Sequence, residues 1–66
     1  MPTDKLREKY LYRAKIIKGN IYGLPIGKEF LFARKMKDID GIEIYSYGGS
    51  YRIYFMNRDE VELTEA

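Results

Sequence analysis

The chain has 66 residues and a formal net charge of +2, so we expect one domain with a small core. It contains neither Cys nor His, which excludes disulfides, thiol nucleophiles and imidazole bases and argues against a structural zinc site. No apolar segment approaches the roughly 20 residues of a membrane helix, and no leader-like apolar run follows the N-terminus, so we expect a cytoplasmic protein that needs no cofactor and contacts no membrane.

Residues 3–9 (TDKLREK) can begin a helical turn. Thr3 or Asp4 suits the N-cap position. Leu6 is the one apolar side chain in this segment, and so short a helix is marginal by itself. We therefore expect residues 1–9 to form a short helical turn or a flexible arm that precedes a domain of residues 10–66.

The first predicted strand covers residues 10–18 (YLYRAKIIK). Tyr12, Ala14 and Ile16 alternate along it and share one face. Residues 21–28 (IYGLPIGK) contain two Gly and one Pro, a composition typical of a long irregular loop.

Residues 29–37 (EFLFARKMK) form the second predicted strand. Strict alternation places Phe30, Phe32, Arg34 and Met36 on one face, which is the inward one. A helix is the alternative, because several of these residue types also favour helices. The short flanking loops and the alternating Phe residues favour the strand.

A three-residue loop that ends at Gly41 is predicted to follow, with Gly41 in the left-handed position of a bulge. This loop pairs Met36 with Ile44. A two-residue turn would mix apolar and charged side chains on one face, so we prefer the longer loop.

The sequence GIEIYSYGGSYRIYFM predicts a hairpin around the Gly pair at positions 48–49, since Gly readily takes the positive φ angles of a tight turn. A two-residue turn places Ile44 opposite Ile53 on the apolar face. On the other face it places Tyr45 opposite Arg52. The sheet should then cover a core on one side and present tyrosine and charge on the other.

Residues 57–60 (NRDE) predict a polar turn or a short 3₁₀ segment, and residues 61–64 (VELT) predict a last short strand. The expected fold is all-β, with five strands. The segments YRAKIIKG, NIYGLPIGKEF and NRDEVEL give it an order and spacing that resembles an SH3-like small barrel over about residues 10–64. An OB-like barrel is the closest alternative, but it usually needs a longer chain and a helix between strands.

Combining the two predicted registers brings cationic and phenolic side chains together on the outer sheet face. Such a surface can stack a base and neutralise a phosphate, and it has the composition of protein-binding hot spots. It can also be an exposed face whose tyrosines reflect strand propensity. The candidate partner-binding residues are Lys35, Lys37, Tyr45, Tyr47, Arg52 and Tyr54.

Charge is unevenly distributed along the chain. Residues 1–37 carry ten Lys and Arg and three acids, whereas residues 38–66 carry two Arg and seven acids. The basic part can form a face for an anionic partner. Alternatively, basic early strands pair with acidic late strands, which is the interpretation we favour.

These features favour a binding module over an enzyme, because no carboxylate pair is clearly placed in an apolar pocket. Another protein is the expected partner. The chain lacks the tryptophan and the acidic, aromatic first loop of SH3 domains proper, so a proline-rich ligand is not expected. The alternative is nucleic-acid binding through the same face and the basic arm. The last strand could also mediate weak self-association, so the chain is expected to be a monomer or a weak homodimer.

Overall fold

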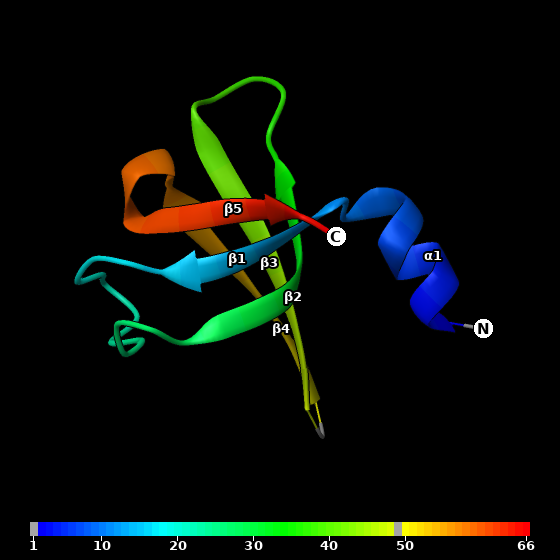
Figure 1. Cartoon of the computed structure of the whole chain (residues 1–66), viewed down its shortest axis with the longest axis horizontal. Coiled ribbons are helices and arrows are strands. Elements are labelled where there is room, and N and C mark those ends of the chain that lie inside the picture. The colour runs from blue at the N-terminus through cyan, green and yellow to red at the C-terminus, as the bar shows by residue number, and fades with distance from the viewer. Residues whose placement is uncertain (1, 49) are drawn as a thin grey trace.

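The computed structural model describes residues 2–48 and 50–66. Five antiparallel strands form one sheet in the order β4-β3-β2-β1-β5 (Figure 1). The elements are α1 (Pro2–Lys9), β1 (Tyr12–Ile16), β2 (Glu29–Lys35), β3 (Gly41–Gly48), β4 (Ser50–Asn57), the 3₁₀ helix η1 (Arg58–Glu60) and β5 (Val61–Glu65). The predicted all-β fold of five strands is confirmed. Within the described residues, no helix is long and apolar enough to cross a membrane.

The core lies on the inner face of the curved sheet. As predicted, β1 contributes Ala14 and Ile16 to it. Ile42 and Ile44 of β3 are fully buried there, and Val61 of β5 closes the cluster. Alternation along each strand therefore separates this inner face from an outer one.

The β3–β4 hairpin has a different register from the one that the sequence predicted. Tyr45 lies opposite Ile53, and Ile44 lies opposite Tyr54. The prediction paired Ile44 with Ile53 and Tyr45 with Arg52, and it is wrong by one residue. A shift of one residue moves every β4 side chain to the other face.

The cause lies in the turn and in the sequence of β4. Gly48 pairs with Ser50, so the two-residue turn is not formed; Gly49 itself lies outside the described residues. Apolar side chains occupy both alternations of β4, so the pattern fits either face. In the structure Met56 is buried and Tyr54 packs against the core, and these two residues define the inner face.

Strand β2 contains an irregularity that the alternating pattern did not indicate. Tyr12 pairs with Ala33 and Ala14 pairs with Phe30. The two β2 residues at positions 31–32 therefore face a single β1 residue, as in a β-bulge. The bulge interrupts the alternation, so Phe30 and Ala33 can both be buried.

The bulge corrects the predicted position of Arg34. Strict alternation placed Arg34 and Phe32 on the inner face with Phe30. Instead, Phe32 pairs with Tyr45 and Arg34 pairs with Glu43, all on the outer face. An inward Arg would have brought an uncompensated charge into the core, and the bulge avoids that cost.

The predicted loop that ends at Gly41 is also wrong. Ala33, rather than Met36, lies opposite Ile44, and the Met36 N–H donates to the Gly41 carbonyl at 3.0 Å. Gly41 is the first residue of β3 and has no positive φ. The loop between β2 and β3 is longer than predicted because the bulge shifts the register of these strands. In the observed register Ala33 pairs with Ile44, and both residues stay in the core.

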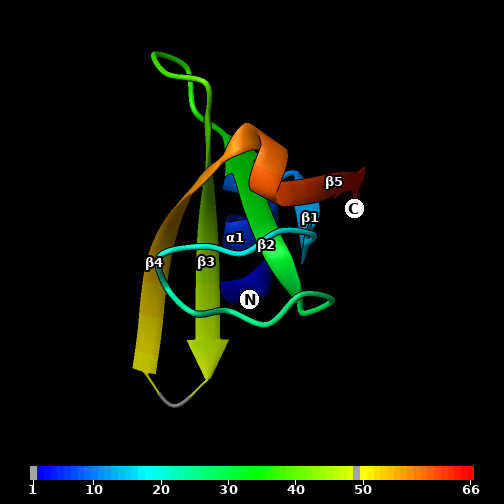
Figure 2. The same cartoon turned by 90° about the vertical axis from the view of Figure 1, so that its left-hand side faces the viewer.

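The loop of residues 17–28 crosses the inner side of the sheet towards β4 (Figure 2). The Asn20 carboxamide oxygen accepts hydrogen bonds from the backbone N–H groups of Tyr22 at 3.2 Å and Leu24 at 3.0 Å. Leu24 packs against the core, and the Tyr22 ring meets that of Tyr54 edge-on at 4.9 Å. This irregular loop, which the sequence predicted, is thus fixed by a side-chain cap and by aromatic contact.

The basic and acidic parts of the chain meet in the folded structure. Lys18 bonds Asp59 at 2.9 Å, and Arg34 bonds Glu43 at 2.8 Å. Each ion pair joins the basic part of the chain to the acidic part. These ion pairs agree with the interpretation that the basic early part of the chain pairs with the acidic late part.

Candidate binding face

The outer faces of β2, β3 and β4 form a continuous surface, and α1 and Tyr10 cover one part of it. We call Phe32, Arg34 and Glu43, which lie beneath α1 and Tyr10, the covered half. We call the exposed part the open half, and it consists of Tyr47, Tyr51, Ile53 and Phe55. Tyr45 lies on the border between the two halves and is half-buried.

A buried polar cluster holds the covered half together. The Tyr10 hydroxyl donates to Glu43 Oε2 at 2.5 Å, and Arg34 Nη2 donates to Glu43 Oε1 at 2.8 Å. Tyr10 and Glu43 are only 2% and 6% exposed. A carboxylate this deeply buried needs such partners, since an unpaired buried charge is costly.

The same contacts shift two pKa values in opposite directions. The hydrogen bond from Arg34 holds the pKa of Glu43 below its usual range, against the opposing effect of burial, and the Tyr10 bond adds to this. Burial, together with the bond to Glu43, raises the pKa of Tyr10 to about 12. The cluster is therefore an ionised carboxylate between a cation and a neutral phenol.

Arg7 attaches α1 to the sheet. Its guanidinium donates to the Tyr10 carbonyl at 2.9 Å and to the Leu31 carbonyl at 2.7 Å, and it lies 4.6 Å above the Phe32 ring centre. Leu31 belongs to the bulge of β2, so Arg7 satisfies a carbonyl at the point where the ladder is irregular. Tertiary contacts of this kind hold a helix that is too short to be stable alone.

The open half is aromatic and aliphatic, and it is accessible to solvent. Exposure is 74% for Tyr47, 64% for Tyr51, 54% for Phe55 and 41% for Ile53. Tyr51 stacks on Tyr45 with a ring separation of 5.8 Å and an angle of 10°. The paired region of β2 and β3 ends at Phe32 and Tyr45, so the hairpin end that carries Tyr47 and Tyr51 extends past β2.

The structure separates the six candidate residues that the sequence placed on one face. Tyr45 and Tyr47 lie on the outer face as predicted. Arg52 and Tyr54 lie on the inner side, because the register differs by one residue. Lys35 pairs with Ile42 at the end of β2, and its ammonium lies 5.2 Å from the Tyr12 ring centre.

Lys37, the last candidate, is exposed in the loop between β2 and β3. The cations that the sequence placed beside the tyrosines are therefore not part of the open half. Ile53 and Phe55, which the sequence assigned to the core, are part of it instead. Only the correct hairpin register could have identified them.

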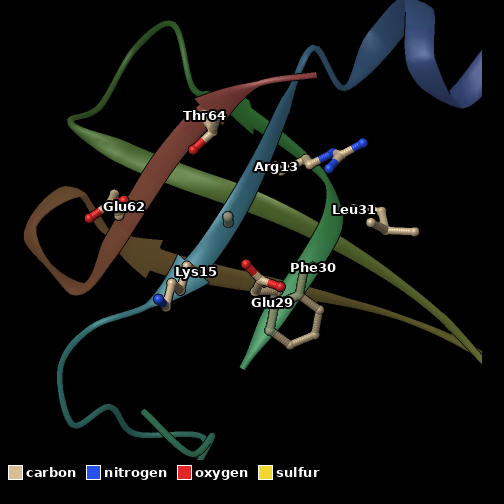
Figure 3. A pocket seen from close by; sticks show the side chains of 8 residues that line it. Arg13, Lys15, Glu29, Phe30, Leu31, Glu62 and Thr64 are labelled. Atoms are coloured by element: carbon tan, nitrogen blue, oxygen red, sulfur yellow. The ribbon is translucent and has the colours of Figure 1, made fainter. Parts of the chain in front are cut away.

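Two shallow depressions lie near these strands. One, of about 230 Å³, lies over β1, β2 and β5 and contains both acidic and basic side chains. Figure 3 shows Arg13, Lys15 and Glu62 pointing in different directions rather than towards a common point. The polar groups of this depression therefore do not converge in the way that those of known catalytic sites do.

The second depression adjoins the binding face. Its volume is about 240 Å³, and Leu31, Phe32, Tyr45 and Tyr47 are among its lining residues. It opens where β2 and β3 diverge, and so it extends the aromatic surface sideways with room for a side chain.

No protein-family model, curated protein or solved structure matches this chain. The chemistry of the chain's own residues is therefore what indicates a function. The most informative feature is the candidate binding face, because this surface combines fixed aromatic rings with accessible apolar area.

Proposed function

We propose that this domain is a non-enzymatic binding module that docks on another protein through the open half. The observation that carries the proposal is the exposure of four large apolar or aromatic side chains on adjacent strands. Contiguous apolar surface of this kind is a mark of interaction sites on small soluble domains.

The residue types suit protein recognition. Tyrosine provides large contact area with few side-chain torsions to immobilise, and tyrosine is enriched among residues that dominate binding energy. The stack of Tyr45 on Tyr51 pre-orients one of these rings. The adjoining depression could receive a side chain from the partner.

The distribution of charge favours a protein partner over a nucleic acid. Phosphate recognition needs accessible cations beside the stacking rings. Arg52 lies on the other side of the sheet, while Arg34 is paired with Glu43 and Arg7 bonds two backbone carbonyls. None of these three cations lies on the open half with Tyr47 and Tyr51. Lys28, which lines the adjoining depression, is one exposed cation, whereas phosphate binding relies on several.

At the level of fold, we propose that the chain is an SH3-like small barrel. The strand order β4-β3-β2-β1-β5, the long loop after β1 and the 3₁₀ segment η1 before β5 support this assignment. Such folds carry unrelated functions, so the proposal of protein binding comes from the open half and not from the fold.

The proposal is tested by capture from a lysate of the native host, using the double variant Tyr51→Ser/Ile53→Ser. The control variant is Ile21→Ser, which removes an apolar side chain that is 92% exposed and lies in the loop after β1. We expect wild type and the control to retain the same protein and the double variant to lose it. Equal retention by all three would reject the open half as the contact surface.

A salt series separates the protein partner from the nucleic-acid alternative. Amide NMR titration with a mixed-sequence DNA duplex and a single strand should produce no shifts at Tyr47, Tyr51 or Ile53. Shifts at these residues that disappear as salt rises would instead indicate phosphate binding.

A further inference from the structure

Strand β4 forms a free edge of the sheet (Figure 2), and a tyrosine from a distant loop closes it at one residue. The Tyr22 hydroxyl donates to the Phe55 carbonyl at 3.1 Å and accepts from the Phe55 N–H at 3.0 Å. Both backbone groups of Phe55 therefore point away from β3. A single side chain takes the place that a neighbouring strand would otherwise occupy.

The direction of the Phe55 backbone determines the direction of its neighbours in β4. In an antiparallel pair, successive residues point their backbone groups alternately towards the partner strand and away from it. The β3–β4 register is uninterrupted, so Ile53 and Tyr51 also point their N–H and C=O groups outwards. Among the described residues, no hydrogen bond from a loop or side chain satisfies these groups.

The edge also lacks the features that usually prevent strand addition. Its sequence, SYRIYFMN, has no Pro and no Lys, and β4 has no bulge against β3. A long regular edge with apolar side chains is a template for another strand. Arg52 is the only charged residue in β4, and the Tyr22 cap occupies the edge at Phe55 alone.

We propose that this edge, between the hairpin end and Tyr22, binds an extended segment of the partner protein by strand addition. The inference rests on the proposed function and specifies how the partner binds. The segment has an apolar-acidic-apolar pattern. Its apolar side chains flank Tyr51 and Ile53 on the outer face, and its carboxylate lies opposite Arg52, which is exposed and has no ion pair with any described residue.

In two registers, a second copy of β4 is a poor occupant of the same edge. Two-fold antiparallel pairing centred on Arg52 would place this side chain opposite its own copy, and like charges in that position repel. Pairing centred on Ile53 would require the backbone of Phe55, which Tyr22 occupies. An acidic segment of another chain meets neither obstacle.

The test uses an end-capped probe peptide, Thr-Val-Glu-Val-Thr, and amide hydrogen exchange of the full chain followed by NMR. We expect exchange at Tyr51 and Ile53 to slow by roughly tenfold when the peptide concentration is ten times its dissociation constant. N-methylation of both valines should abolish the effect, because their amides face β4. N-methylation of the glutamate amide, which points away, should preserve it.

Charge reversal provides the matched control. A peptide with Lys in place of Glu should bind more weakly to wild type, and the exposed substitution Arg52→Glu should reverse that preference. Equal binding of both peptides would contradict the assigned role of Arg52.

Other outcomes would overturn the inference. Shifts of the open-half side chains without slowed exchange would reject strand addition while leaving the proposed function intact. No response at millimolar peptide would also reject it. Protection of Tyr51 and Ile53 that rises with protein concentration in the absence of peptide would assign the edge to a second copy of the chain.

Discussion

The covered half, on β2 and β3, and the open half, on β3 and β4, lie on the same face of the sheet, yet one is sealed and the other is exposed to solvent. Strand β3 shows the contrast on its outer face, where Glu43 is buried and Tyr47 is exposed. The covered half contains a carboxylate and a guanidinium, and the open half contains tyrosine, isoleucine and phenylalanine. Polar residues are thus buried and apolar ones exposed, the reverse of the usual arrangement.

The helix α1 and Tyr10 account for this inversion. Tyr10 and Arg34 satisfy the Glu43 carboxylate with hydrogen bonds, which removes most of the cost of burying it, and Arg7 holds the covering helix in place through the Tyr10 and Leu31 carbonyls. No described segment covers the open half in the same way. The difference indicates that the covered half serves stability, whereas the open half is free to bind a partner.

The largest expected effect comes from breaking the covered cluster with Glu43→Ala. This substitution leaves Arg34 and Tyr10 without their shared acceptor. Removing one partner of a buried ion pair costs about 3–5 kcal/mol. Since the Arg34 side chain is 30% exposed, we expect a loss of about 2–3 kcal/mol in the free energy of unfolding.

Denaturant unfolding measures this loss, with the exposed β5 residue Glu62 as the matched control in Glu62→Ala. The control should change stability by less than about 0.5 kcal/mol. Equal effects of the two substitutions would contradict the role of the cluster. Because the folded-state pKa of Glu43 is lowered, its stabilisation is present above the unfolded pKa of about 4.3 and is lost as pH falls through the lowered value.

The second prediction concerns the loss of stability at alkaline pH, which we compare between wild type and the variant Tyr10→Phe. The folded-state pKa of Tyr10 is raised from 10.0 to about 12, so the folded state holds this proton more tightly than the unfolded state does. The associated stabilisation, of about 3 kcal/mol, is complete below pH 10 and is lost as pH rises towards 12. Thermal melting from pH 9 to about pH 12 should fall less steeply in Tyr10→Phe than in wild type. Parallel curves would show that Tyr10 ionises normally.

The third prediction concerns the attachment of α1. Arg7→Ala removes two hydrogen bonds to carbonyls and the contact with Phe32, and we expect a loss of about 1 kcal/mol. Amide exchange within α1 should accelerate more than exchange in β1. Arg13→Ala, on the exposed side of β1, is the control, and it should leave α1 unchanged.

The sequence predicted the elements better than it predicted the pairing between them. Alternation identified β1, and the polar NRDE segment identified η1 because a turn is needed before VELT. Both faces of β4 are apolar, so its pattern could not decide between registers. At the bulge of β2, Arg7 bonds the Leu31 carbonyl and Ala33 is buried, and neither contact is visible in local alternation.

The candidate site followed the register, and so its composition was only partly predictable. Tyr45 and Tyr47 were identified because β3 alternates clearly between apolar and polar residues. Arg52 and Tyr54 were assigned to the wrong face with the rest of β4. The covering role of Tyr10 was equally inaccessible, because its hydroxyl bonds Glu43 across 33 positions of sequence.

The smallest expected effect on stability is in the open half. Tyr51→Ser/Ile53→Ser removes two exposed side chains and should cost about 1 kcal/mol or less in total, mainly through strand propensity and the lost Tyr45 stack. Denaturant unfolding tests this directly. A loss as large as that of Glu43→Ala would mean that these residues are core and that the two halves do not differ.

The open half and the free edge both depend on the β3–β4 register, and NMR contacts between backbone Hα protons of the two strands measure this register. Pairs that exchange no backbone hydrogen bonds bring their Cα atoms to about 4.5 Å. We expect strong NMR contacts between the Hα protons of Tyr45 and Ile53 and of Tyr47 and Tyr51. Contacts between Ile44 and Ile53 in their place would return Ile53 to the core and contradict both the binding face and the strand-addition site.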